Sequence, residues 1–138
     1  MKCRSFVHSF SCRAAVGKCP TDYGKIGEDL AVRFLKRKQF LVLCRNWTFD
    51  RGEIDIVALD RNCGVLVFVE VKLRSCESLV PGYFAVNKKK KEILRRTCRA
   101  YLRKFTRCGV SYRFDVIEIR MRNGKNYQIL HYENVKLF

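Results

Sequence analysis

The sequence predicts a single α/β domain, and three observations support this fold class. Hydrophobic residues make up 48% of the chain, which is enough to build a core. A length of 138 residues is typical of one domain. The hydrophobic periodicity changes along the chain and gives the order helix, strand, strand, strand, helix, strand, strand.

The first half of the chain holds one predicted helix and three predicted strands. Thr21 or Asp22 can cap a helix that runs to about Lys38 and carries an apolar residue at every fourth position. Three β-prone segments follow the helix, at residues 40–49, 53–59 and 65–72.

Side chains alternate along the second and third of these strands. In the second strand, Ile54 and Ile56 are expected on one face and Asp55 on the other. In the third strand, four valines take one face, while Glu70 and Lys72 take the other. This run of residues is too apolar for an exposed hairpin, so we expect a sheet that is covered on both faces.

The second half begins with an irregular stretch at residues 73–86, followed by a helix over about residues 87–107. Two further strands are predicted at residues 112–121 and 127–133, joined by a hairpin turn at Asn123 and Gly124. The apolar stripe of the second helix consists of Ile93, Leu94, Cys98, Tyr101, Leu102 and Phe105.

Residues 1–21 contain basic residues and no acid, and we expect a loosely ordered basic tail before a domain at residues 22–138. The tail lacks the apolar segment of a secretory signal, and no run in the chain is apolar enough to span a membrane. The eight cysteines include no Cys-x-x-Cys pair and fit no recognised zinc spacing. We therefore expect a cytoplasmic protein with reduced thiols.

The net charge of +16 favours a polyanionic partner such as nucleic acid over a merely soluble basic protein. Ten Lys and Arg residues fall within residues 88–107, and several recur every four positions along one side of the predicted helix. Like charges at this spacing destabilise a helix, and a phosphate backbone would relieve them. The alternative is a solvated basic face. The candidate nucleic-acid-binding residues are Lys88, Lys89, Lys90, Lys91, Arg95, Arg99 and Arg103.

A pair of carboxylates on neighbouring strands indicates a metal-binding site. If residues 61–64 form the loop between these strands, paired positions sum to 125 and Asp55 lies opposite Glu70. The Cβ atoms of such a pair lie about 4.5–5.5 Å apart. Two carboxylates that close repel each other unless a cation lies between them, and a divalent metal with oxygen ligands meets this need. Lys72 would then orient or deprotonate a water.

Glu28 on the first helix borders the packed side and could reach the acidic face of the sheet. The alternative is an acid that is favoured near a helix N-terminus by the helix dipole.

Several motifs together resemble one known family. They are G-x-x-G-E-D-L-A at residues 24–31, R-N-W at 45–47, G-E-I-D-I-V-A at 52–58, L-V-F-V-E-V-K-x-R at 66–74, A-V-x-x-x-K at 85–90 and R-F-D-V at 113–116. In these motifs the chain resembles the YraN family of uncharacterised bacterial proteins, part of the PD-(D/E)XK restriction-endonuclease-like superfamily. The resemblance covers about residues 24–138.

The resemblance implies a restriction-endonuclease-like fold, with a mixed β-sheet flanked by helices. By the same resemblance Asp55, Glu70 and Lys72 are the catalytic residues, and Asp55 and Glu70 bind Mg²⁺ or Mn²⁺. Glu28 corresponds to a helical acid of related Holliday-junction resolvases and would be a further metal ligand. Glu53 replaces the proline of the superfamily motif and is an accessory acid. Lys90 falls where the family often carries a basic residue, and the carbonyl of Val71 would be a further metal ligand.

The leading hypothesis is a metal-dependent nuclease that acts on DNA, with branched or damaged DNA as candidate substrates. A homodimer would suit a cut in both strands. The alternative is a non-catalytic nucleic-acid-binding module with the same fold. A basic structural protein of a ribonucleoprotein is a third reading, but it leaves the pairing of Asp55 with Glu70 unexplained.

Overall fold

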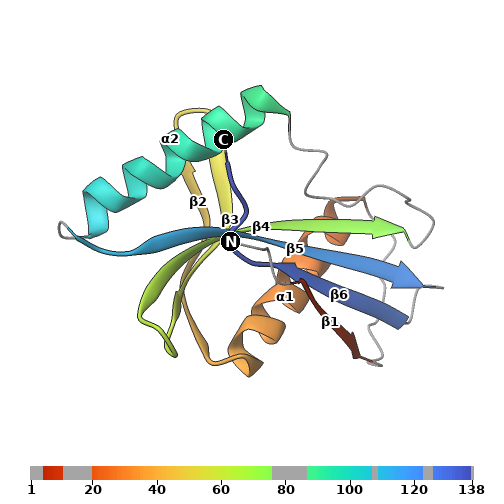
Figure 1. Ribbon diagram of the computed structural model, residues 1–138. Helices are drawn as coiled ribbons and strands as arrows, with labels where there is room; N and C mark the ends of the chain where they lie inside the picture. Colours follow the sequence, from red (N-terminus) through yellow and green to blue (C-terminus); the bar gives the residue numbers. More distant parts are fainter. Residues whose placement is uncertain (1–4, 11–19, 76–86, 107–108, 123–125, 138) are drawn as a thin grey trace.

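A six-stranded mixed sheet with one helix on each face forms the molecule (Figure 1). The computed structural model describes residues 5–10, 20–75, 87–106, 109–122 and 126–137. The strand order in the sheet is β1-β6-β5-β4-β3-β2. The elements are β1 (Ser5–Phe10), α1 (Pro20–Arg37), β2 (Phe40–Phe49), β3 (Gly52–Asp60), β4 (Val65–Ser75), α2 (Lys88–Phe105), β5 (Tyr112–Arg122) and β6 (Asn126–Tyr132).

The predicted fold class and the order of the last seven elements are confirmed. β2 has the predicted bounds, whereas β4 continues to Ser75, into the stretch that was expected to be irregular. The remainder of that stretch and the turn at Asn123 and Gly124 lie outside the described residues. The division of the chain at residue 22 stays a prediction.

β1 is a strand that the sequence analysis did not predict, because it lies in the segment that was expected to be a loose tail. It pairs antiparallel with β6, with Ser5 opposite Tyr132 and Phe10 opposite Tyr127. β6 would otherwise be an edge strand with unpaired amides and carbonyls. Residues 5–10 of the predicted tail thus continue the sheet, through a pairing between segments that are far apart in the sequence.

β4 and β5 form the parallel pair of the sheet, whereas the other neighbouring strands are antiparallel. A parallel pair needs a long crossover connection, and α2 supplies it between β4 and β5. In Figure 1, α2 and α1 lie on opposite sides of the sheet.

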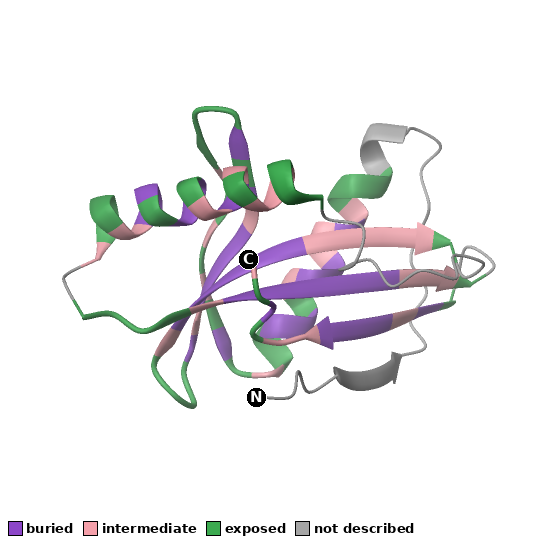
Figure 2. Cartoon of the chain, turned by 45° about the horizontal axis from the view of Figure 1, so that its top comes forward, coloured by how far each residue is buried: buried purple, intermediate pink, exposed green. Residues whose placement is uncertain are grey.

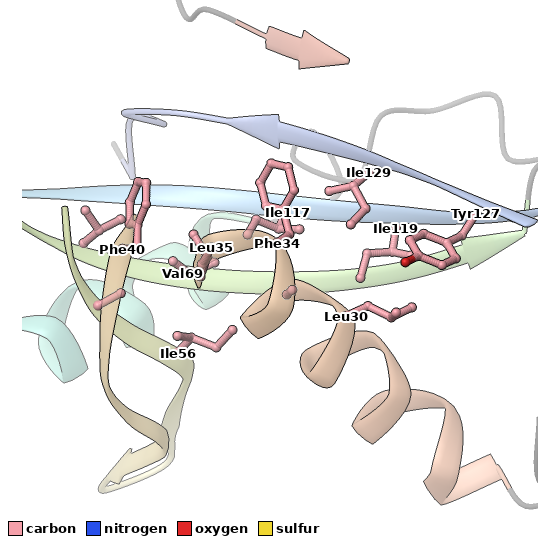
Figure 3. Packing of buried hydrophobic residues seen from close by; sticks show 13 residues of the cluster. Leu30, Phe34, Leu35, Phe40, Ile56, Val69, Ile117, Ile119, Tyr127 and Ile129 are labelled. Atoms are coloured by element: carbon pink, nitrogen blue, oxygen red, sulfur yellow. The ribbon is translucent and has the colours of Figure 1, made fainter. Parts of the chain in front are cut away.

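Two hydrophobic clusters fill the space between the sheet and its helices, as expected for a sheet covered on both faces. Val67 and Val69 of β4 belong to the cluster beneath α1. Figure 3 shows Leu30 and Phe34 of α1 within this cluster. On the other face, Phe68 of β4 packs in the cluster beneath α2. Each such side chain contributes about 1.5–3 kcal/mol when it is fully buried.

A buried polar network ties the end of the chain to the sheet. Asp115 of β5 accepts hydrogen bonds from Arg113 Nε at 3.1 Å and from the amide of Asn134 at 2.8 Å. The His131 Nε2 atom lies 2.9 Å from Asp115 Oδ2, and both side chains are fully buried. Arg113 Nη1 also donates to Asp60 Oδ2 at 3.1 Å. The R-F-D-V motif therefore has a structural role here.

The part of the chain that the structure describes contains no helix with the length and apolar character needed to cross a membrane. Three cysteines in the same part of the chain, Cys44, Cys63 and Cys98, are free thiols.

Candidate active site

Asp55 lies where the pairing between β3 and β4 ends. Paired positions sum to 125 from Asp60 with Val65 to Ile56 with Val69, which is the predicted register. The pairing stops there, so the predicted pair of Asp55 opposite Glu70 is not formed. Beyond that point the amide of Val71 donates a hydrogen bond to Asp55 Oδ2 at 2.6 Å. The carboxylate of Asp55 is thus fixed against the backbone of β4.

The alternation of side chains between the two faces of the sheet is interrupted in β3 at Asp55. Ile54 packs in the cluster beneath α2, whereas Ile56 packs in the cluster beneath α1. The prediction that these two isoleucines share a face is therefore wrong. At the start of the strand, Gly52 lies so close to α2 that an added Cβ would overlap the Thr97 hydroxyl.

Glu70 of β4 is a buried carboxylate with two lysine partners. Its side chain is 5% exposed, and its Oε1 accepts hydrogen bonds from Lys72 Nζ at 2.5 Å and from Lys90 Nζ at 2.6 Å. Lys72 was expected at this place. Lys90 was expected among the nucleic-acid-binding residues, but it turns inward from the first turn of α2. Two ammonium groups therefore converge on one carboxylate oxygen.

The pKa values reflect this crowding of charge. Burial raises the pKa of Asp55 to about 7, together with the negative charges of Glu70 and Glu28 and against the hydrogen bond from Val71. Burial lowers the pKa of Lys90, but its hydrogen bond and its attraction to Glu70 outweigh burial and raise that pKa. Asp55 is thus about half ionised near neutral pH, and an added cation would stabilise its charged form.

Glu28 of α1 lies near Asp55 and Glu70 and accepts hydrogen bonds from two residues of β2. Its Oε2 accepts hydrogen bonds from Arg45 Nη2 at 3.2 Å and from Asn46 Nδ2 at 3.1 Å. Asn46 Nδ2 also lies 3.3 Å from Glu53 Oε1 and so links the helical acid to the accessory acid. Asn46 has a φ of 51°, a conformation that asparagine tolerates better than most residues. The R-N-W motif marked these residues, but sequence reasoning gave them no role.

The donors around Asp55 suit a hard cation. No group of three or more His, Cys, Asp or Glu side chains that could hold a metal ion occurs within residues 20–75, 87–106, 109–122 and 126–137. The donor set is instead the carboxylate pair of Asp55 and Glu70, with Glu28 beside it. Mg²⁺ commonly binds through one or two carboxylates, several waters and a substrate phosphate. The oxygen donors present therefore fit Mg²⁺ or Mn²⁺.

Comparison with known proteins gives the family. The model of the uncharacterised protein family UPF0102 matches residues 27–119. The chain belongs to this family. A UPF0102 protein of Alkaliphilus oremlandii is 43% identical over 114 residues, which cover 80% of this chain and 94% of the relative. A UPF0102 protein of Chlorobium phaeobacteroides is 40% identical over 114 residues, or 83% of this chain and 89% of the relative.

A UPF0102 protein of Desulfosudis oleivorans is 39% identical over 102 residues, which cover 74% of this chain and 81% of the relative. The UPF0102 match confirms the resemblance to the YraN family. It spans the residues of the candidate site in this chain, from Glu28 through Asp55 and Glu70 to Lys90. UPF0102 is described as uncharacterised, so membership of the family assigns no activity.

The basic face of α2 in this UPF0102 chain extends away from the carboxylates. Lys88, Lys89, Arg99 and Arg103 are exposed, and Figure 2 shows exposed and buried turns alternating along α2. Lys91 and Arg95 are half-buried, and Arg95 Nη2 forms an ion pair with Glu92 at 2.8 Å. Of the seven candidate nucleic-acid-binding residues, the structure leaves four fully on the outward surface.

Phe105, expected in the apolar stripe of α2, is 54% exposed. Its ring packs against Trp47 of β2, with 5.2 Å between ring centroids, and does not enter the core beneath α2. The ammonium of Lys104 lies 5.3 Å from the Trp47 ring. The last turn of α2 thus places aromatic and basic side chains together at the surface, an arrangement that suits contact with nucleic acid.

Proposed function

We propose that this UPF0102 protein is a metal-dependent nuclease of the cytoplasm that hydrolyses phosphodiester bonds in DNA. The observation that carries the proposal is the closeness of the Asp55 and Glu70 carboxylates on adjacent strands, just beyond the point where the pairing between β3 and β4 ends. Their carboxylates are close enough for Glu70 to help raise the pKa of Asp55 to about 7. Such perturbed carboxylates are typical of functional sites, and a divalent cation between them would stabilise the ionised pair.

Different residues of the chain would bind the metal, orient the water and bind the DNA. Asp55 and Glu70, with Glu28 beside them, would hold Mg²⁺ or Mn²⁺. The metal, when bound, stabilises charge on the phosphate and lowers the pKa of its water. Lys72, next to Glu70, would orient the attacking water or stabilise charge on the phosphate. The exposed basic face of α2 would hold the backbone of the DNA. Two copies in a homodimer would cut both strands.

Cleavage of plasmid and branched DNA in Mg²⁺ or Mn²⁺ tests the proposal. We expect Asp55→Asn to lower the cleavage rate at least about 100-fold, because the change removes a metal ligand. Asp50→Asn is the matched control, since Asp50 is exposed in the turn between β2 and β3. Chelation of the metal should stop cleavage. Equal cleavage by wild type and Asp55→Asn, or none by either on any substrate, would contradict the proposal.

The alternative function is a nucleic-acid-binding module without chemistry. The net charge of +16 and the exposed basic face of α2 support binding with or without a reaction. Thermal unfolding separates the two functions. A nuclease should be stabilised by Mn²⁺ in the wild type and not in Glu70→Gln. A binding module should show no Mn²⁺ effect and should bind DNA equally well in a chelator.

A further inference from the structure

Lys90 has a position that a simple phosphate contact does not explain. Its ammonium lies 2.6 Å from Glu70 Oε1, the same oxygen that accepts from Lys72 at 2.5 Å. Glu70 needs at least one cation because its side chain is only 5% exposed. Lys72, two residues along the same strand, already meets that need. Lys90 is therefore a second cation at a carboxylate that would also bind the metal.

The count of charges at the site indicates what Lys90 does there. When Asp55 and Glu70 are both ionised, the ammonium groups of Lys72 and Lys90 balance them. Glu28 shares the Arg45 guanidinium with Asp29, at 3.2 and 2.7 Å, so the charges that bear directly on Glu70 are those of its own two ammonium partners. A dication gains little from a carboxylate oxygen that two ammonium groups already neutralise, so a metal at Glu70 binds more tightly when one of them leaves.

Lys90 is the ammonium that is free to leave. Its side chain is 44% exposed, compared with 26% for Lys72. It also lies in the first turn of α2, beside the exposed Lys88 and Lys89, where a DNA backbone would lie on the basic face. A phosphate close to the site would offer Lys90 a second anionic partner.

We propose that Lys90 and a divalent cation compete for Glu70, so that the metal binds tightly once a phosphate group draws Lys90 away. This inference rests on the proposed metal site. By linkage, a bound phosphate backbone and a bound metal raise each other's affinity by the same factor. Lys90 is then a positioning residue that couples metal loading to the presence of the substrate.

Calorimetric titration with Mn²⁺ in the absence of nucleic acid tests the competition. We expect Lys90→Gln to bind Mn²⁺ about tenfold more tightly than the wild type, because the competing charge is gone. Lys90→Arg keeps the charge and should bind like the wild type. Lys89→Gln is the matched control: it removes the same charge from an exposed neighbour and should also bind like the wild type. A residue with a merely structural role would not strengthen metal binding when it is replaced.

The outcomes separate this inference from the proposed function. Binding by Lys90→Gln that equals or falls below wild-type binding overturns the competition and leaves the metal site intact. If the wild type and all variants fail to bind Mn²⁺, the metal site itself is overturned. Affinity for a short DNA duplex, measured by fluorescence anisotropy, gives a second readout. Mn²⁺ should raise that affinity in the wild type by a larger factor than in Lys90→Gln, and equal factors would contradict the coupling.

Discussion

Asp55 illustrates the conflict between a functional residue and the stability of the fold. Its carboxyl is largely buried, with Glu70 and Glu28 nearby, and its pKa of about 7 lies well above the ordinary 3.8. Without a cation, the folded state must either keep a proton on Asp55 or tolerate a poorly solvated charge. The residue most important for chemistry should therefore destabilise the metal-free domain.

Replacing Asp55 with asparagine should stabilise the protein in a chelator. The unfolded state loses its proton near pH 4 and the folded state near pH 7, so wild-type stability falls as the pH rises between these values. Asn cannot ionise, and its oxygen can still accept the hydrogen bond from Val71. We expect the free energy of unfolding at pH 8 to rise by about 1–3 kcal/mol, with no gain below pH 4.

Urea unfolding between pH 4 and pH 8 measures this effect, with Asp50→Asn as the control that should show no such gain. A variant Asp55→Asn that is less stable than the wild type at pH 8 would show that burial does not penalise the carboxylate.

At the scale of the element, the contact between β3 and α2 depends on a glycine. A Cβ at Gly52 would lie 2.9 Å from Ile93 Cγ2 and would overlap Thr97 Oγ1. Thr97 is 1% exposed and its hydroxyl donates to the carbonyl of Ile93 at 2.8 Å, so it has little room to move. We expect Gly52→Ala to lower the free energy of unfolding by about 1–3 kcal/mol.

Gly24→Ala is the control for that change. Gly24 lies in α1 with open space around it, so alanine there should raise stability by up to about 1 kcal/mol through helix propensity. Denaturant unfolding of both variants measures the two effects. Equal stability of Gly52→Ala and the wild type would show that α2 shifts away easily.

The exposed face of α2 should set the salt dependence of DNA binding. Arg99 and Arg103 are both exposed, and each phosphate contact contributes about 0.9 to the slope of log K against log salt concentration. Arg99→Gln and Arg103→Gln should each reduce this slope by about one unit for any DNA sequence. Fluorescence anisotropy over a series of KCl concentrations measures it. Lys36→Gln, an exposed change at the end of α1, should leave the slope unchanged.

At the scale of the whole molecule, the buried Asp115 network connects α1 to the end of the chain. Lys38 Nζ lies 3.2 Å from His131 Nδ1, and because an ammonium only donates, His131 Nε2 carries the proton that bonds to Asp115. The same network includes Arg113 and Asp60. Removing one member leaves other buried polar groups without partners.

Asp115→Ala should therefore be among the most destabilising changes in the chain. We expect a loss of about 3–5 kcal/mol, since Arg113 and His131 would lose their common partner in the interior. Urea unfolding followed by circular dichroism measures the loss. The exposed control, Asp50→Asn, should change stability by less than about 0.5 kcal/mol, because asparagine tolerates the φ of 52° at this position. A small effect at Asp115 would mean that water replaces the lost carboxylate.

Local patterns predicted much of this fold. A short turn was sufficient for the register between β3 and β4 from Asp60 with Val65 to Ile56 with Val69, and the alternation of side chains was sufficient for the two faces of β4. Contacts between distant segments were not predictable in this way. Lys90 reaches Glu70 because α2 lies at a suitable distance from the sheet. The periodicity of the sequence carries no information about that distance. The hydrogen bond from Arg45 of β2 to Glu28 likewise depends on how α1 crosses the sheet. The strand β1 forms only because β6, near the other end of the chain, offers it a sheet edge.

The Asp115 network also constrains when the domain can fold during synthesis. Its members range from Lys38 to Asn134, so its last partners emerge from the ribosome about a hundred residues after the first. Until then, the buried Asp115 carboxylate has Arg113 as its partner but lacks its hydrogen bonds with His131 and with the amide of Asn134. Folding should therefore reach completion only after translation of the segment around residue 134.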